Sequence, residues 1–286
     1  MLAQKLYFCC PYNYRKVKMT YTKVILKPHK DEPVLRRHPW IFSGAIASIE
    51  GKSEEGEIVE VFSYKGTYLA TGYLCDGSIA VKLISFQQCK VDVDFWTTKL
   101  TEAYTLRKHL GLTDNPHTNC YRLVSSEGDG LPGLVIDFYA GTAVIQTHSV
   151  GIHDAKPQIV EALKNLYGST LLAVYDKSAD AMARQTSLDD LQDAYLWGNS
   201  GRVVAKENAR SFVVDWEHGQ KTGFFLDQRD NRSLLTNFVQ GKRVLNTFCY
   251  TGGFSVYALT AGAAHVDSVD CSQQALDILG ENLTQN

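Results

Sequence analysis

The chain has 286 residues, of which 44% are hydrophobic and 21% are charged, as in an ordinary globular protein of two or three domains. No stretch approaches the roughly 18 consecutive apolar residues of a membrane-spanning helix, so we expect no membrane association. The seven cysteines form no C-x-x-C pair and no zinc spacing. This scattered set of cysteines argues against a structural metal site. Because no export signal is present, we expect the protein to be located in the reducing cytoplasm.

The net charge of −2 excludes a polycation overall, but positive charge concentrates near the N-terminus. Residues 1–40 contain nine lysine and arginine residues against Asp31 and Glu32, a local charge of +7. One basic face is enough for nucleic-acid binding, whereas the alternative is a solvated, partly disordered tail. In residues 1–20 the order of charged and apolar residues is the reverse of a secretory signal, so we expect a disordered extension there.

Residues 21–90 predict a small domain of short strands. Turns that contain glycine separate runs rich in β-branched and aromatic residues, which is typical of a closed or half-open β-barrel. The expected strands include Ile58–Ser63, Thr67–Leu74 and Ile79–Ser85.

The segment that leads into this domain mixes basic and aromatic residues. Arg36, Arg37 and His38 could present charge to a nucleic-acid phosphate. The three residues Trp40–Phe42 are expected to be core anchors, because large apolar side chains are usually buried.

Residues 91–205 predict a central α+β domain. Asp92 or Asp94 is placed to cap a helix that ends near Gly111, since a carboxylate there accepts free backbone N–H groups. The apolar stripe of this helix consists of Trp96, Leu100, Ala103 and Leu110. Further expected elements are a strand within Tyr121–Asp137, a strand over Thr142–His148, a helix over Asp154–Tyr167 and a buried strand over Leu171–Asp176. Residues 178–209 are weakly patterned and predict a connector.

Residues 206–286 begin with a predicted strand, Ser211–Trp216, and a motif-like stretch, Gly219–Arg232. The end of that stretch predicts a helix that Asp227 caps. The apolar positions of this helix are Leu234, Leu235, Phe238 and Val239.

The stretch Arg243–Asp270 has the pattern of a nucleotide-binding strand–turn–helix–strand unit. A glycine turn lets backbone groups approach a ligand, and the following helix offers unpaired N–H groups at its N-terminus. Asp270 lies 18 residues beyond Gly252, close to the roughly 20 expected for an acid that accepts ribose hydroxyls. The alternative is a structural turn with an incidental acid.

The glycine spacing of this turn narrows the choice of ligand. A dinucleotide site needs G-x-G-x-x-G, but the sequence reads Tyr-Thr-Gly-Gly-Phe over residues 250–254. A single glycine pair suits an adenosine ligand without a pyrophosphate, such as S-adenosylmethionine.

Four stretches in the right order resemble the class I S-adenosylmethionine-dependent methyltransferases of the bacterial ribosomal RNA cytosine-5 group. They read RRHPWIFSGAI (36–46), YRLVSSEGDGLPGLVID (121–137), GQKTGFFLDQRDNR (219–232) and VLNTFCYTGG…VDSVD (244–270). The resemblance implies an α/β and α+β multidomain fold. It comprises a PUA-like β-barrel, a central α+β domain and a Rossmann-like methyltransferase domain that is incomplete at residue 286.

The resemblance also implies roles for individual residues. Asp270 would hold the ribose of S-adenosylmethionine, and Lys221, Gln228 and Arg229 would border its pocket. The methionine side of the cofactor would be lined by Asn246, Phe248, Tyr250, Thr251 and Gly252. The implied partner is ribosomal RNA, a homodimer is compatible with this build, and no metal is implied.

Cytosine C5 methylation needs a thiolate that adds at C6 and a target base swung out of its stack. In this family the attacking cysteine lies on a later strand, so Cys249 and Cys271 are not expected to be nucleophiles. We therefore expect the chain to be truncated, with its catalytic residues beyond Asn286, and inactive alone. Two alternatives stay open: a ribosomal RNA guanine methyltransferase of related build, and a catalytically silent RNA-binding module.

Overall fold

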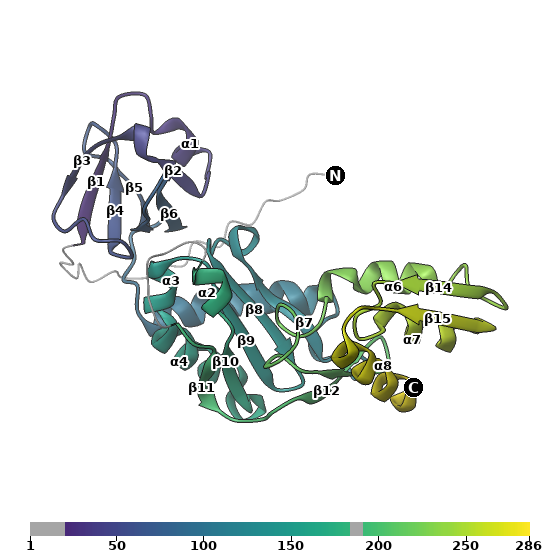
Figure 1. Cartoon of the computed structure of the whole chain (residues 1–286). Helices are drawn as coiled ribbons and strands as arrows, with labels where there is room; N and C mark the ends of the chain where they lie inside the picture. The colour runs from purple at the N-terminus through teal and green to yellow at the C-terminus, as the bar shows by residue number, and fades with distance from the viewer. Residues whose placement is uncertain (1–20, 184–190) are drawn as a thin grey trace, which may run out of the picture.

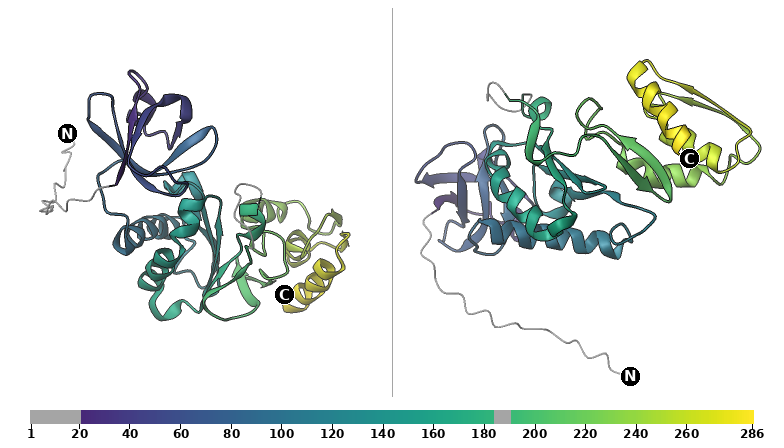
Figure 2. Two further views of the ribbon diagram at one scale, coloured as in Figure 1. Left: turned by 60° about the vertical axis from the view of Figure 1, so that its left-hand side comes forward. Right: turned by 90° about the horizontal axis from the view of Figure 1, so that it is seen from below.

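The computed structural model describes residues 21–183 and 191–286, so the expected N-terminal extension of residues 1–20 lies outside the described residues. Three parts follow one another along the molecule (Figure 1). Two further views place the N-terminal strands and the C-terminal strand pair at opposite ends of the central sheet (Figure 2). Within the described ranges, no helix is both long and apolar enough to cross a membrane, and no group of three or more His, Cys, Asp and Glu could hold a metal ion.

The first part is a six-stranded sheet in the order β2-β6-β5-β4-β1-β3, in which only the β1–β4 pair is parallel. The strands expected near residues 58, 67 and 79 are confirmed as β4, β5 and β6. Closure of the sheet into a barrel stays a prediction. The elements are β1 Thr22–Leu26, α1 Glu32–Leu35, β2 Trp40–Phe42, the 3-10 helix η1 Ser43–Ala45, β3 Ile46–Glu50, β4 Ile58–Phe62, β5 Tyr68–Leu74 and β6 Ile79–Ser85.

The expectation that Trp40–Phe42 are all core anchors is wrong in part. Ile41 is buried at 3% exposure, but the Phe42 side chain is 51% exposed. Successive side chains of a strand point to opposite faces, so a three-residue edge strand buries only its middle residue here.

The central part has a five-stranded sheet in the order β11-β10-β9-β8-β7, which confirms the expected α+β unit. Asp92 caps α2 by accepting a hydrogen bond from the backbone N–H of Phe95 at 3.2 Å. Leu110 does not belong to the apolar stripe: it follows the helix and is 64% exposed. The elements are α2 Val93–His109, β7 Cys120–Ser125, the 3-10 helix η2 Ser126–Asp129, β8 Leu134–Tyr139, β9 Thr142–Thr147, α3 Val150–Asp154, α4 Lys156–Tyr167, the 3-10 helix η3 Gly168–Thr170 and β10 Ala173–Asp176.

The expectation of a connector over residues 178–209 is wrong where the structure describes the segment. It contains α5 Ala179–Ala183, β11 Ala194–Gly198 and β12 Val203–Glu207. Strand β11 pairs with β10 at the edge of the central sheet, and β12 forms a hairpin with β13 (Arg210–Val214). In both strands exposed positions alternate with less exposed ones, so neither has the continuous buried run of a central strand.

The first and central parts are joined by polar contacts, two of which are buried. The Tyr73 hydroxyl donates to the carbonyl of Pro132 at 2.6 Å, and the Ser149 hydroxyl donates to Tyr73 at 2.8 Å. The indole N–H of Trp40 donates to Glu127 at 3.1 Å. These contacts fix the N-terminal sheet on the end of the central sheet.

The C-terminal part starts from the β12–β13 hairpin and ends in the parallel pair β14–β15. Asp227 does not cap a helix by its side chain, since α6 begins at Arg229 after a 3-10 turn and its N-cap is Gln228. Of the apolar positions of the expected helix, Leu234 and Phe238 are 56% and 67% exposed, and Phe238 lies after α6 has ended at Leu235. The further elements are the 3-10 helix η4 Leu226–Gln228, α6 Arg229–Leu235, β14 Arg243–Thr247, α7 Gly253–Thr260, β15 His265–Val269 and α8 Gln273–Gln285.

One apolar core joins the central sheet to the C-terminal part. It combines side chains of the central strands with those of the hairpin, the segment before α6, and α7. Its buried members are Cys120, Tyr139, Val144, Tyr175, Ala205, Phe212, Val214, Trp216, Phe224, Leu226, Val256 and Tyr257. The C-terminal part is therefore built onto the central domain.

Candidate cofactor site

The candidate site lies where β14 and β15 end side by side. The two strands are parallel with Asn246 opposite Ser268 and Thr247 opposite Val269, so their carboxyl ends meet at one edge. The backbone N–H of Cys249 donates to the carbonyl of Val269 at 3.0 Å and extends this pairing into the turn. The residues that follow both strands therefore share one end of the pair.

Asp270 connects the two strand ends directly. Its carboxylate accepts a hydrogen bond from the backbone N–H of Tyr250 at 2.8 Å and one from that of Ser272 at 3.0 Å. The bonds from Ser272 and Tyr250 hold the pKa of Asp270 below its ordinary value. An ionised carboxylate has about four acceptor positions, so these bonds leave room for further donors such as ribose hydroxyls.

The turn between β14 and α7 has a left-handed backbone at three alternating positions. The φ angles are 57° at Phe248, 48° at Tyr250 and 78° at Gly252, whereas side-chain-bearing residues rarely adopt positive φ. A Cβ atom at Gly252 would lie 2.6 Å from Cγ of Leu279, so only glycine fits there. Backbone strain of this kind clusters at ligand-binding sites.

The side chains of the turn divide into exposed and anchored ones. Phe248 is 90% exposed, whereas Thr251 is buried and its carbonyl accepts from the Asn282 amide at 2.8 Å. The Asn246 amide donates to the Ser255 hydroxyl at 2.8 Å, which fixes it against α7. The structure therefore brings together Asn246, Phe248, Tyr250, Thr251, Gly252 and Asp270.

Tyr250 ties this turn to the segment before α6. Its hydroxyl accepts from the backbone N–H of Gln220 at 3.0 Å and donates to the carbonyl of Gly223 at 3.2 Å. Its ring packs edge-on against Phe225 with centroids 5.3 Å apart. Lys221, exposed and with φ of 52°, lies in the loop that Tyr250 holds.

The same loop is anchored to the central sheet. The Thr222 hydroxyl donates to the fully buried carboxylate of Asp137 at 2.6 Å, and Arg122 donates to that carboxylate at 2.9 and 3.0 Å. The hydroxyls of Tyr139 and Thr222 lie 2.9 Å apart. The central domain therefore fixes the position of the loop that borders the cofactor turn.

Gln228 and Arg229 make their hydrogen bonds and ion pairs with close neighbours in the chain. Among the described residues, Gln228 is hydrogen bonded to Asp227 and Asn231. Arg229 pairs with its neighbour Asp230 and lines a cavity of about 290 Å³ between α2, β7 and the segment before α6. The structure therefore does not join these two residues to the Asp270 end of the site.

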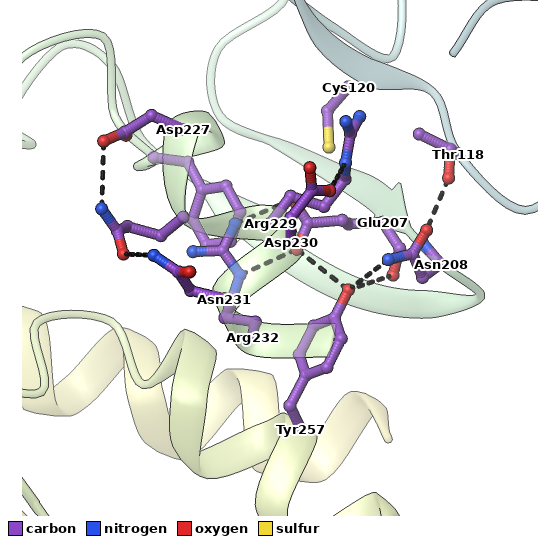
Figure 3. A network of polar contacts seen from close by, with 12 residues as sticks. Thr118, Cys120, Glu207, Asn208, Asp227, Arg229, Asp230, Asn231, Arg232 and Tyr257 are labelled. Atoms are coloured by element: carbon purple, nitrogen blue, oxygen red, sulfur yellow. Dashed lines mark hydrogen bonds and ion pairs between the residues drawn. The ribbon is translucent and has the colours of Figure 1, made fainter. Parts of the chain in front are cut away.

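A buried charge network holds α6 and α7 in place (Figure 3). Arg232 donates two hydrogen bonds of 2.8 Å to Glu207, and the side chains are 2% and 0% exposed. The Tyr257 hydroxyl donates to the same carboxylate at 3.0 Å, and the Arg232 guanidinium lies 4.5 Å from the Phe224 ring centroid. A Cβ atom at Gly253 would lie 3.1 Å from Cδ of Arg232, so Gly253 packs on this arginine.

Sequence reasoning missed Glu207, Arg232 and Tyr257 as supporting residues. Arg232 ends a motif-like stretch, which was a signal, but nothing in the sequence names its partner 25 residues earlier.

The predicted RNA-binding residues lie on the first part. Arg36 is exposed and pairs with Glu32, while the Arg37 guanidinium lies 5.3 Å from the Phe86 ring centroid. The His38 ring meets Trp40 edge-on at 5.9 Å. These three residues are not part of the cofactor turn.

Comparisons with known proteins agree with this division. Residues 24–86 match the PUA-like domain family, and residues 189–286 match the S-adenosylmethionine-dependent methyltransferase family. The chain combines a PUA-like domain with an S-adenosylmethionine-dependent methyltransferase domain. S-adenosylmethionine, the expected cofactor, is therefore confirmed at the level of the domain family.

The curated relatives are ribosomal RNA large subunit methyltransferases. The chain is 38% identical over 268 residues to ribosomal RNA large subunit methyltransferase I of Escherichia coli (strain SMS-3-5), covering 92% of this chain and 66% of the relative. It is also 38% identical over 267 residues to the protein of that name from Erwinia tasmaniensis, with the same coverage. The chain spans about two thirds of the length of these relatives.

Solved structures share the fold of the PUA-like and methyltransferase domains together. One is described as an S-adenosylmethionine-dependent methyltransferase from Streptococcus mutans, with 25% identity, a TM-score of 0.76, and coverage of 92% of this chain and 67% of that one. A second methyltransferase, complexed with S-adenosylhomocysteine, has 25% identity, a TM-score of 0.77, and coverage of 92% and 66%. These comparisons do not bear out truncation or missing catalytic motifs, which stay predictions.

Replacing Arg232 by alanine should lower the free energy of unfolding by about 3–5 kcal/mol, because it leaves the buried Glu207 carboxylate without its cation. Arg202→Ala is the matched control, since Arg202 pairs with Glu281 while both side chains are about half exposed, at 52% and 41%. An exposed pair contributes about 0–1 kcal/mol. Urea unfolding of the full chain measures both, and equal losses would contradict a special role for Arg232.

Gly252→Ala should destabilise the methyltransferase domain by more than about 1 kcal/mol, because alanine resists a φ of 78° and its Cβ meets Leu279. Gly280 lies inside α8, where a Cβ atom would have no heavy atom within 4 Å. Gly280→Ala should therefore raise stability by about 0.5–1 kcal/mol. Thermal unfolding of the two variants should show shifts of opposite sign. An unchanged melting temperature in Gly252→Ala would contradict this and show that the turn can change its conformation to accept a Cβ atom.

Proposed function

We propose that the Phe248–Gly253 turn and Asp270 bind S-adenosylmethionine, and that the chain belongs to an enzyme that methylates large-subunit ribosomal RNA. The proposed cofactor site is supported above all by the position of the Asp270 carboxylate. It follows the end of β15 and is hydrogen bonded to the glycine turn at the end of β14. Its remaining acceptor positions suit the two hydroxyls of a ribose.

The other turn residues would bind the methionine end of the cofactor. Their backbone is held in a left-handed form at Phe248, Tyr250 and Gly252, and Asn246 supplies an amide fixed by Ser255. Lys221 offers a positive charge from the loop that Tyr250 anchors. When bound, the cofactor supplies an electrophilic methyl group. The residues of this chain bind and orient it, and no residue here is assigned to the transfer.

The substrate proposal rests on the relatives and on charge. The relatives are named as large-subunit ribosomal RNA methyltransferases, and the PUA-like domain presents exposed basic residues at Arg36–His38. We propose cytosine C5 as the methylated atom because the four motif stretches resemble the cytosine-5 group. Gln228 and Arg229 stay proposed as residues that border the cofactor pocket, because they follow Phe225, whose ring packs on Tyr250 of the turn.

Asp270→Ala should weaken S-adenosylhomocysteine binding at least about tenfold, because a hydrogen bond to a charged group is worth about 1.5–3 kcal/mol. Asp267→Ala is the control on the same strand, since Asp267 is 54% exposed and pairs with His265 and Arg243 outside the turn. Isothermal titration calorimetry measures both affinities. Unchanged affinity in Asp270→Ala, with the fold intact by circular dichroism, would exclude the ribose assignment.

The target atom is tested by incubating the protein with ribosomal RNA and methyl-labelled S-adenosylmethionine, followed by nuclease digestion and mass spectrometry. Any labelled nucleotide would contradict the expectation that the chain is inactive alone. Labelled 5-methylcytidine supports the proposal, and labelled methylguanosine supports the guanine alternative. RNA binding without cofactor binding would instead identify a silent RNA-binding module.

A further inference from the structure

Three rings lie in a row at the edge strand β2 of the PUA-like domain, and the His38 ring contacts both of the others. Trp40 and Phe42 are the first and last residues of β2, and His38 lies two residues before the strand. The His38 ring lies 5.9 Å from Trp40 and 6.5 Å from Phe42, centroid to centroid. The buried Ile41 between them holds the strand on the domain core.

The three rings differ in what already holds them. Trp40 is fixed by its hydrogen bond to Glu127 of the central domain. Phe42, at the outer end of the row, is 51% exposed and contacts only the His38 ring among the described aromatic pairs. The pairing of β2 with β6 shifts register between Ile41 and Phe42, and such an irregularity re-aims a side chain at the edge of a sheet. A single half-exposed ring is ordinary on a protein surface, so a partner is indicated here by the charged groups around Phe42.

The charges around Phe42 identify the chemistry of that partner. The Lys27 ammonium donates to the carbonyl of Gly44 at 2.9 Å, which places a cation two residues beyond Phe42. Arg36 and Arg37 precede the row, and their exposed acid neighbour is Glu32. Cations beside an exposed ring suit a single-stranded nucleic acid, whose phosphates need positive charge and whose unpaired bases stack on aromatic faces.

We propose that Phe42, supported by His38, is a stacking platform for one unpaired base of RNA. This inference rests on the proposed ribosomal RNA substrate and adds the mode of recognition. The platform takes any base, because every base has a π-face, so it supplies affinity for single strands without reading sequence. Lys27, Arg36 and Arg37 hold the adjoining phosphates.

The test compares two variants by fluorescence anisotropy on a labelled single-stranded RNA of about ten nucleotides at several salt concentrations. Phe42→Ala should weaken binding at least about fivefold, which is about 1 kcal/mol, with the salt slope unchanged. The double variant Arg36→Ala/Arg37→Ala should instead reduce the slope by about 1.4, because each phosphate contact on a single strand contributes about 0.7.

Three controls sharpen the result. Phe42→Trp keeps a flat ring and should bind as well as the native protein. Leu172→Ala removes a side chain that is similarly exposed, at 52%, on the central domain and should leave affinity unchanged. Perfectly paired duplex RNA offers no unpaired base, so native protein and Phe42→Ala should bind it equally.

The outcomes separate this inference from the proposed substrate. RNA binding that is identical in the native protein and Phe42→Ala overturns the platform and leaves the RNA substrate standing. No RNA binding by the native protein removes both. A change in sedimentation of Phe42→Ala without a change in RNA affinity would show that a second protein chain covers the ring, which also overturns the platform.

Discussion

The ion pair between Glu207 and Arg232 is the constraint on which the methyltransferase part depends. It is closed to solvent on both sides and joins the end of β12 to α6, and Tyr257 adds α7 through the same carboxylate. Because an unpaired charge in that position would be costly, the three elements keep one arrangement. Gly253, the first residue of α7, packs on Arg232, so the Glu207–Arg232 ion pair also fixes the position of the glycine turn.

A second set of contacts links the central sheet to the cofactor turn. Asp137 holds Thr222, the loop around Thr222 holds Tyr250, and Tyr250 donates its backbone N–H to Asp270. A residue of the central sheet is thereby linked, through one loop, to the carboxylate proposed to bind ribose. At the other end of that sheet, Trp40 and Tyr73 fix the PUA-like domain. The proposed RNA and cofactor surfaces are therefore fixed to the same central sheet.

The sequence predicted the elements whose pattern is local. Strands β4 to β6 are separated by turns that contain glycine, as the sequence predicted. Asp92 caps α2 as expected. The prediction failed where burial depends on tertiary context: Phe42, expected in the core, follows a buried residue on an edge strand and is half exposed. The turn and Asp270 could be found from glycine spacing, but the Glu207–Arg232 pair could not. Its partners are distant in sequence and share no pattern.

The central claim is that Asp270 and the turn before α7 form the cofactor site. A crystal structure of the protein with S-adenosylhomocysteine tests it most directly. If Asp270 binds the ribose, both ribose hydroxyls should lie within about 2.6–3.2 Å of its carboxylate. The amino-acid end of the ligand should then lie against the backbone of residues 248–253. A ligand bound elsewhere, or one whose ribose leaves Asp270 uncontacted, would contradict it.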